Sequence, residues 1–428
     1  MTWQSPIAPG ISWYQATVGE RPEYPALDGS KQVDVAIIGG GYTGLQAACN
    51  LAANGVSVAL IEAHRFGDGA SGRNGGQFGT GQRSFPDEME EQIGFEQSKV
   101  LFDIAEDAKH YVLDFARNHG IDMEYLPGQL YVAHKAAYED DYRKSVDAMN
   151  NRYGYPHISY MERAEARKRV GSTHYFGGTH DTGTGHIHPL KLLVSLAKAA
   201  KAAGADIHEM TPARSIHQSG GKTIIETPSG TLTATRVLIA TNAYIGNLEP
   251  VTAAHIMPIR SFIGATAPLD AYPDIIPGRQ AVADSRFVVR YFRKTADNRL
   301  LFGGREAYTA DTPRDISSHI RRQIAEIYPE LENVDVTHSW GGSVGITLPR
   351  QVFVREVMPG VTSIGGYSGH GVMLSNYCGK LYADLVLGKK DMLAPFARLQ
   401  VPSFPGGASL RAPLLFLALS WYALRDRL

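Results

Sequence analysis

Cysteine, unbalanced charge and long apolar runs are all scarce in this chain of 428 residues. Cys49 and Cys378 are the only cysteines, which excludes a scaffold held together by several disulfides. Because the sequence shows no signal peptide, we expect both thiols to be reduced and the protein to be cytoplasmic. The formal charge of -1 gives no electrostatic reason to expect a nucleic acid as partner.

The most apolar stretch, residues 414–423, is about ten residues long and therefore too short to cross a bilayer. We expect it to form a C-terminal helix that packs on the body or on a sister subunit, which leaves a homo-oligomer open. The alternative is contact with a membrane surface, but an amphipathic anchor would carry more Lys and Arg on one face.

Metal-ligand motifs are also missing. The sequence has neither HExxH nor CxxC, and the pair His186 and His188 lacks a matching ligand set. We therefore expect no metal site. What remains is an ordinary globular composition, 43% hydrophobic and 20% charged, in a chain long enough for two domains.

The most informative feature that is present is a glycine turn, residues 39–44, between two largely apolar runs. The first run covers residues 33–38; an alanine-rich helical stretch, the second run (residues 56–61) and Glu62 follow the turn. Strand, glycine turn, helix, strand and acid is the order typical of a dinucleotide-binding βαβ unit. The alternative is a glycine-rich turn in an ordinary α/β protein.

Each part of this unit has a physical task. Gly39 permits the tight turn, Gly41 lets the backbone approach a pyrophosphate, and Gly44 lets the helix lie against the strand. The helix N-terminus directs unpaired N–H groups at the phosphates. Glu62 can accept hydrogen bonds from a ribose diol and disfavours the extra phosphate of NADP. The contacts predicted for this unit are Gly39, Gly41, Tyr42, Thr43, Gly44, Glu62 and Ala63.

A second glycine-rich loop follows the acid almost at once, in residues 67–79. Its glycines let the backbone track a planar ligand, and its Ser, Arg, Asn and Gln side chains can bind hydroxyls, phosphate and ring carbonyls. The alternative is a flexible surface loop, although flexible linkers rarely combine these residue types. The contacts predicted here are Gly69, Ala70, Ser71, Arg73, Asn74, Gly75, Gly76 and Gln77.

A third glycine turn, about three hundred residues later, indicates which dinucleotide binds. Residues 361–372 predict a strand, a glycine turn and the start of a helix that ends near Gly388. A second helix N-terminus would stabilise the negative charge of a reduced flavin, which favours FAD over NAD. The contacts predicted here are Gly369, His370, Gly371, Val372 and Met373, with Thr241 and Asn242 after a buried strand and Ala213 beside the adenine.

Together, GGGYTGL, Glu62, GASGRNGGQ and GYSGHGV resemble the D-amino-acid-oxidase-like FAD-dependent oxidoreductases. Residues 185–190, 295–304, 404–407 and 424–428 narrow the resemblance to the gamma-glutamylputrescine oxidases, while residues 84–171 and 251–284 match only loosely. Some relatives attach their flavin through cysteine. Neither Cys49 nor Cys378 matches such a position, so we expect non-covalent FAD.

This resemblance and the strand-rich pattern of residues 257–342 predict an α/β fold, in which a Rossmann-like FAD-binding domain is joined to a substrate domain built on an antiparallel sheet. The predicted segments are 31–84, 172–250 and 343–395 for the FAD-binding domain, 85–171 and 251–342 for the substrate domain, 1–30 for an N-terminal arm and 396–428 for a C-terminal tail helix.

Flavin-dependent amine oxidation needs a neutral amine whose C–H faces flavin N5; hydride transfer then leaves an imine that water hydrolyses to an aldehyde. Four residues are candidates for contacts near the ring: His188, Trp340, Tyr367 and His370. Each has a structural alternative. His188 is placed to cap the helix that starts at Pro189, His370 to orient its loop, and the two aromatic residues to fill the core.

The resemblance implies oxidation of gamma-glutamylputrescine or a similar omega-amine, with molecular oxygen as acceptor and release of ammonia and hydrogen peroxide. The carboxylate of such a substrate calls for a cation, and the candidates are Arg260, Arg290, Arg293 and Arg305, each of which equally suits a solvated surface. Three alternatives stay open: an imino or N-methyl amino acid oxidase of the sarcosine or pipecolate kind, a dehydrogenase with another electron acceptor, and a non-catalytic flavin-binding module.

Overall fold

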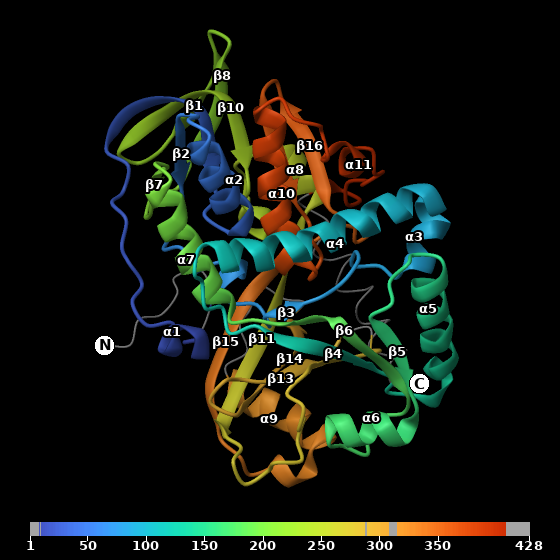
Figure 1. The fold of residues 1–428 in the computed structure, drawn as a ribbon. Coiled ribbons are helices and arrows are strands. Elements are labelled where there is room, and N and C mark those ends of the chain that lie inside the picture. The colour runs from blue at the N-terminus through green and yellow to red at the C-terminus, as the bar shows by residue number, and fades with distance from the viewer. Residues whose placement is uncertain (1–7, 9, 287–288, 308–314, 408–428) are drawn as a thin grey trace.

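Two β-sheets organise the chain, one above the other in the view of Figure 1. The computed structural model describes residue 8 and residues 10–286, 289–307 and 315–407. Within these residues the first sheet has eight strands and the second has nine. α4 (Phe95–Asn118) crosses the view of Figure 1 where the two sheets meet.

Five strands of the first sheet run parallel, in the order β17-β10-β1-β2-β7. Residues 35–38 of β1 are all buried, as expected for a parallel strand covered on both faces. Antiparallel strands extend the sheet beyond β17 and beside β10. The strands are β1 (Gly29–Ile38), β2 (Val58–Ile61), β7 (Asp206–His208), β8 (Ser215–Ser219), β9 (Lys222–Glu226), β10 (Gly230–Ile239), β16 (Phe353–Met358) and β17 (Val361–Gly365).

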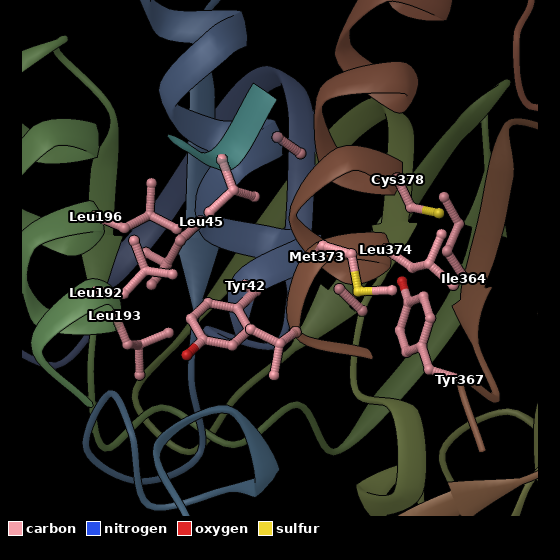
Figure 2. Packing of buried hydrophobic residues seen from close by; sticks show 14 of the residues in the cluster. Tyr42, Leu45, Leu192, Leu193, Leu196, Ile364, Tyr367, Met373, Leu374 and Cys378 are labelled. Carbon is pink, nitrogen blue, oxygen red and sulfur yellow. The ribbon is translucent and has the colours of Figure 1, made fainter. Parts of the chain in front are cut away.

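Three helices, α2 (Tyr42–Ala53), α7 (Pro189–Ala202) and α10 (Gly371–Val386), pack side by side on this sheet. Figure 2 shows Leu45 of α2 facing the leucines of α7, while Met373 and Leu374 of α10 pack on the other side of α2. α10 approaches α2 closely at Gly379, where a Cβ would lie only 2.2 Å from the carbonyl oxygen of Thr43. The predicted βαβ unit is therefore present, and α10 lies against its helix.

The second sheet is mostly antiparallel, with β4 and β12 as a parallel pair. One face packs on α9 (Ile316–Ile327) through Phe292, Phe302 and Ile320. Alternate residues such as Tyr291 therefore point to the other face. The strands are β3 (Gln77–Phe78), β4 (Leu126–Val132), β5 (Ile158–Met161), β6 (Gly178–His186), β11 (Met257–Pro268), β12 (Ala281–Asp284), β13 (Tyr291–Lys294), β14 (Arg299–Ala307) and β15 (Val336–Ile346).

The remaining helices surround these layers. Gly94, with φ +78°, separates α3 from α4 within the region where the sequence predicts long helical stretches. Among the described residues, no helix is both long and apolar enough to cross a membrane. These helices are α1 (Trp13–Thr17), α3 (Pro86–Ile93), α5 (Glu139–Asn151), α6 (Arg163–Val170), α8 (Pro250–His255) and α11 (Ala394–Ala397).

Some elements lie in a different sheet from the one that the predicted segments suggest. β3 and β6 belong to the second sheet, although residues 31–84 and 172–250 are assigned above to the FAD-binding domain. The predicted N-terminal arm contains α1, in which Trp13 and Tyr14 are buried. The predicted tail helix at residues 414–423 lies outside the described residues. The domain division itself stays a prediction.

Candidate active site

The first glycine turn is held tightly against the end of β10. Gly39 has φ +108°, and a Cβ there would lie 2.8 Å from the carbonyl group of Ala240. A Cβ at Gly44 would lie 1.9 Å from the carbonyl oxygen of Gly39, which is a severe clash. The close packing of α2 on the turn therefore requires glycine at both positions.

The second glycine loop lies directly on the first. The hydroxyl of Ser71 accepts a hydrogen bond from the backbone N–H of Tyr42 at 3.1 Å, at the start of α2. Asn74 orders the loop from within, because its amide donates to the carbonyls of Ala70 and Ser71 and accepts from the N–H of Gly76. This loop is thus a hydrogen-bonded structure and not a flexible surface segment.

Two buried arginines attach this loop to the rest of the chain. Arg73 donates to the carbonyls of Gly341 (2.6 Å) and Gly10 (2.9 Å), and burial lowers its pKa to about 10. Arg293 donates to the carbonyl of Gly75 at 2.9 Å, and also to a carbonyl in the segment before α7. Both guanidinium groups hold backbone carbonyls of segments distant in the sequence.

The third glycine turn reaches the same place. His370, directly before α10, forms a hydrogen bond through Nε2 to the carbonyl oxygen of Thr80, at 2.9 Å. Its ring packs on Gly79, where a Cβ would lie 2.5 Å from the imidazole. Burial lowers the pKa of His370 to about 4, so the ring is neutral at physiological pH. The N-terminus of α10 therefore adjoins the end of the second glycine loop.

A cavity of about 920 Å³ lies where these segments meet. The second glycine loop and the residues up to Met89 form one wall, the start of α10 forms another, and one face of the second sheet forms the floor. Ala70 and Val372 both line it, so the second and third glycine segments share one cleft. Its polar lining includes Gln77, Arg83, Gln129, Asp181, Arg286 and Arg350.

The residues beside the first turn fit a dinucleotide. Burial raises the pKa of the Glu62 carboxyl, whose oxygens accept hydrogen bonds from the N–H groups of Gly40 (2.8 Å) and His64 (3.0 Å). The Thr241 hydroxyl, next to Gly39, is buried without a hydrogen-bond partner among the described residues. A bound ligand could supply that partner. Asn242 accepts from the N–H of Gly366 at 2.9 Å, which joins the end of β10 to the third turn.

Two further predicted contacts have neighbours that suit the same ligand. Ala63 follows Glu62 at the carboxyl end of β2, where the parallel sheet opens. Ala213 packs beside the core of the first sheet, and its N–H has no hydrogen-bond partner among the described residues. That N–H is available to an adenine ring.

His188 caps α7 instead of lining the cavity. The Thr17 hydroxyl donates to the carbonyl of Trp13, so it accepts from His188 Nε2–H at 3.0 Å. Nδ1 is then the acceptor for the N–H of Lys191, at 3.1 Å. Burial lowers the pKa of His188 to about 3, which keeps this neutral tautomer. The geometry favours the capping alternative.

His188→Asn is expected to leave the limiting rate of flavin reduction within about twofold, because asparagine can still cap a helix. The folded pKa of about 3 lies below the unfolded value near 6.5, so the wild type loses stability as the pH falls through that window. The variant should lose less, as measured by thermal unfolding from pH 7 to pH 4. A hundredfold fall in rate at full FAD content would instead assign His188 to catalysis.

Trp340 and Tyr367 lie in the core and not in the cavity lining. The indole N–H of Trp340 donates to the carbonyl of Arg73 at 2.9 Å, and the Tyr367 hydroxyl bonds to Thr43 at 2.7 Å. Trp340 is thus bonded to the second glycine loop and Tyr367 to α2, both from the core side. Of the four candidates near the ring, His370 alone lines the cavity among the described residues.

The predicted arginine candidates also lie elsewhere. Arg293 is tied to the second loop, Arg290 pairs with Glu326, and Arg260 is not part of the cavity lining. The side chain of Arg305 lies outside the described part of the chain. Arg73, predicted as a cofactor contact, lines the cavity, but sequence reasoning missed the three other arginines that do so. Only Arg83 had a usable signal, since it follows the glycine loop by four residues. The missed arginines are Arg83, Arg286 and Arg350.

No group of three or more His, Cys, Asp or Glu side chains suited to a metal ion occurs in residues 10–286, 289–307 and 315–407. Cys49 and Cys378 are free and buried in α2 and α10. Burial raises the pKa of Cys49 to about 11 and that of Cys378 to about 12, so neither is a reactive thiolate. Non-covalent attachment of the cofactor stays a prediction.

The chain belongs to the FAD dependent oxidoreductase family, whose model matches residues 34–385. FAD is therefore its cofactor, and the protein is an FAD-dependent oxidoreductase. It is 68% identical to a probable oxidoreductase OrdL of Rhizobium meliloti (strain 1021) over 427 residues, with 100% of both chains covered. It is 33% identical to the gamma-glutamylputrescine oxidoreductase of Escherichia coli (strain K12) over 423 residues, 97% of this chain and 98% of the relative.

Among solved structures, the chain is similar to glycine oxidase from Geobacillus kaustophilus, with a TM-score of 0.72 at 24% sequence identity. That likeness covers 87% of this chain and 100% of the other. It confirms the predicted fold class, a Rossmann-like FAD-binding domain with a second sheet. The family findings also confirm the predicted resemblance and the predicted cofactor.

Proposed function

We propose that this FAD-dependent oxidoreductase is an amine oxidase acting on gamma-glutamylputrescine or a similar omega-amine. The observation that carries the proposal is the cavity, which is lined by two glycine segments predicted to bind FAD and by a polar sheet face. Its volume of about 920 Å³ accommodates a flavin ring together with an extended substrate. The similarity to the gamma-glutamylputrescine oxidoreductase over nearly the whole chain supports this choice of substrate.

In this proposal the chain's own residues bind, orient and shield the amine. Arg83 and Arg350 supply cations for the distal carboxylate of a gamma-glutamyl group, while Arg286 is already paired with Asp284. Tyr131 and Tyr291 offer apolar ring faces along the path of the alkyl chain. Enclosure of the reacting carbon by these side chains excludes bulk water until the substrate has been oxidised.

FAD, when bound, supplies the acceptor for the hydride of the amine carbon. The first turn of α10 borders the cavity, and its unpaired N–H groups favour negative charge there. The overall reaction consumes the amine, molecular oxygen and water, and yields an aldehyde, ammonia and hydrogen peroxide. We keep the cytoplasm as the proposed location, because both cysteines are free.

An anaerobic panel of amines tests this proposal. The holoprotein is mixed with gamma-glutamylputrescine, putrescine, sarcosine, pipecolate or an N-methylated amino acid, and loss of the oxidised-flavin absorbance is followed. We expect gamma-glutamylputrescine to bleach the flavin fastest. Bleaching only by secondary amines with an adjacent carboxylate would replace the proposal with an imino or N-methyl amino acid oxidase. Rapid bleaching followed by slow reoxidation in air would indicate a dehydrogenase.

A further inference from the structure

Gln129 and Asp181 form a buried polar pair in the floor of the cavity. They are opposite each other on the antiparallel strands β4 and β6. Tyr131 and Thr179, two residues along each strand, line the cavity as well. Because side chains alternate along a strand, all four project from the sheet face that bounds the cavity. Gln129 is 2% exposed and Asp181 is fully buried.

The hydrogen bonds of Gln77 fix the orientation of the Gln129 amide. The Gln77 side-chain N–H donates to the carbonyl of Val282 at 2.9 Å, so the Gln77 side-chain oxygen faces Gln129. That oxygen accepts from the N–H of Gln129 at 3.4 Å. The Oε1 of Gln129 must then point away from Gln77, and no donor among the described residues reaches it.

Only one of the two carboxylate oxygens of Asp181 is hydrogen-bonded. Its Oδ1 accepts hydrogen bonds from the Tyr155 hydroxyl at 2.6 Å and from the N–H of Gly183 at 2.9 Å. Its Oδ2 is buried and has no partner among the described residues. Burial raises the pKa of this carboxyl to about 6, so it is largely ionised at neutral pH.

The charges around Asp181 do not balance. The buried cation nearest in its hydrogen-bond network is Lys109, which donates to the hydroxyl of Tyr155 at 3.2 Å. Lys109 already forms an ion pair with Glu106 at 2.8 Å. No ion pair of Asp181 itself is found among the described residues, so Lys109 is matched by Glu106 and the Asp181 carboxylate has no cation of its own. A buried carboxylate in that state is stabilised by a ligand that brings a cation.

We propose that Asp181 Oδ2 and Gln129 Oε1 bind a second, non-reacting ammonium group of the substrate. Two neighbouring acceptor oxygens, one of them charged, suit an ammonium, which has donors only. A carboxylate beside the reacting amine would hold its proton, whereas hydride loss needs the neutral amine. This inference rests on the proposed function, in which the α-ammonium of the gamma-glutamyl group is the cation bound.

Two unreactive ligands that differ only in this ammonium test the pair. The probes are gamma-glutamylethylamide and glutaric acid monoethylamide, and neither carries the terminal amine that would be oxidised. Each is titrated into the oxidised holoenzyme, and binding is measured by calorimetry and by perturbation of the flavin spectrum. We expect the wild type to prefer the ammonium-bearing probe about 10- to 100-fold, as typical of a charge-assisted hydrogen bond.

Asp181→Asn keeps the acceptor for Tyr155 and Gly183, so the variant should retain FAD. Its preference for the ammonium-bearing probe should fall below about threefold. Gln129→Met should weaken the preference about three- to tenfold. The matched control is Asp141→Asn, which removes the same charge from an exposed residue of α5 bordering the cavity and should keep the full preference.

The inference is overturned if Asp181→Asn prefers the ammonium-bearing probe as strongly as the wild type does. It is also overturned if the wild type binds both probes equally. Loss of FAD from both Asp181→Asn and Gln129→Met overturns it as well, because Gln129 and Asp181 would then serve the fold alone. The result of this binding experiment can be told apart from the result of the amine panel. If gamma-glutamylputrescine fails to bleach the flavin but the preference depends on Asp181, the ammonium site stands and the proposed function falls.

Discussion

Gly44→Val is expected to purify as a colourless protein. A Cβ at this position would lie 1.9 Å from the carbonyl oxygen of Gly39 and 3.2 Å from the Ile37 side chain. The valine methyl groups therefore force α2 away from β1, and the N–H groups at the start of α2 no longer face the phosphates. We expect at least a hundredfold loss of FAD affinity, measured from the visible absorbance after dialysis.

Gly55→Ala is the matched control for this substitution, at the other end of α2. Gly55 has φ +77° and no neighbouring atom within 4 Å of an added Cβ. The change therefore costs about 1 kcal/mol of backbone strain without a clash, and the protein should stay yellow. A yellow Gly44→Val protein with normal FAD affinity would contradict the assignment of this turn to the dinucleotide.

Arg293→Met is expected to lower the free energy of unfolding by about 3 to 5 kcal/mol. Arg293 is 2% exposed, and its guanidinium donates to the carbonyls of Gly75 and Ile187, both at 2.9 Å, and to the Tyr14 hydroxyl at 3.1 Å. Methionine fills part of the space but leaves these buried acceptors without donors. Because Gly75 belongs to the second glycine loop, FAD affinity should fall as well.

Urea denaturation and FAD titration measure these effects in Arg293→Met and in a control variant. The control is Arg117→Met, since Arg117 is 75% exposed on α4 and pairs with Asp114 at the surface. Such a surface pair contributes at most about 1 kcal/mol. Equal stabilities of the two variants would show that Arg293 does not hold the loop.

The βαβ unit and the three glycine segments could be predicted because their information is local. Gly39, Gly44 and Glu62 occur at fixed spacings within one strand–turn–helix–strand segment. The repeated glycine turn before α10 could be recognised in the same way. That second helix N-terminus favoured FAD over NAD, the family resemblance implied the same cofactor, and the comparisons confirm it.

The orientation of single side chains could not be predicted from the same patterns. Trp340 precedes a pair of glycines and lies near the third glycine turn in the sequence, but its strand directs the indole into the core, where it bonds to Arg73. His188 lies in the segment of residues 185–190 that carries the family resemblance, yet its ring is hydrogen-bonded to Thr17 of the short helix α1. Neither contact is visible in the sequence, because the partners are more than 100 residues away.

The cavity floor was missed for a related reason. Gln129 and Asp181 become neighbours only through the register of β4 and β6, a pairing that spans about fifty residues. Only Gln129 had a signal in the sequence, as a polar residue in a largely apolar strand, whereas β6 is polar along its length and does not single out Asp181. Polar side chains on a buried strand face often mark a binding surface.

A structure of the protein with FAD bound will show whether the glycine segments hold the flavin. We expect the isoalloxazine ring to lie inside the cavity, within about 4 Å of both Gly76 and Val372. The pyrophosphate of FAD should lie at the turn of residues 39–44. A ring bound outside the cavity, or one remote from either residue, would show that these segments do not form the flavin site.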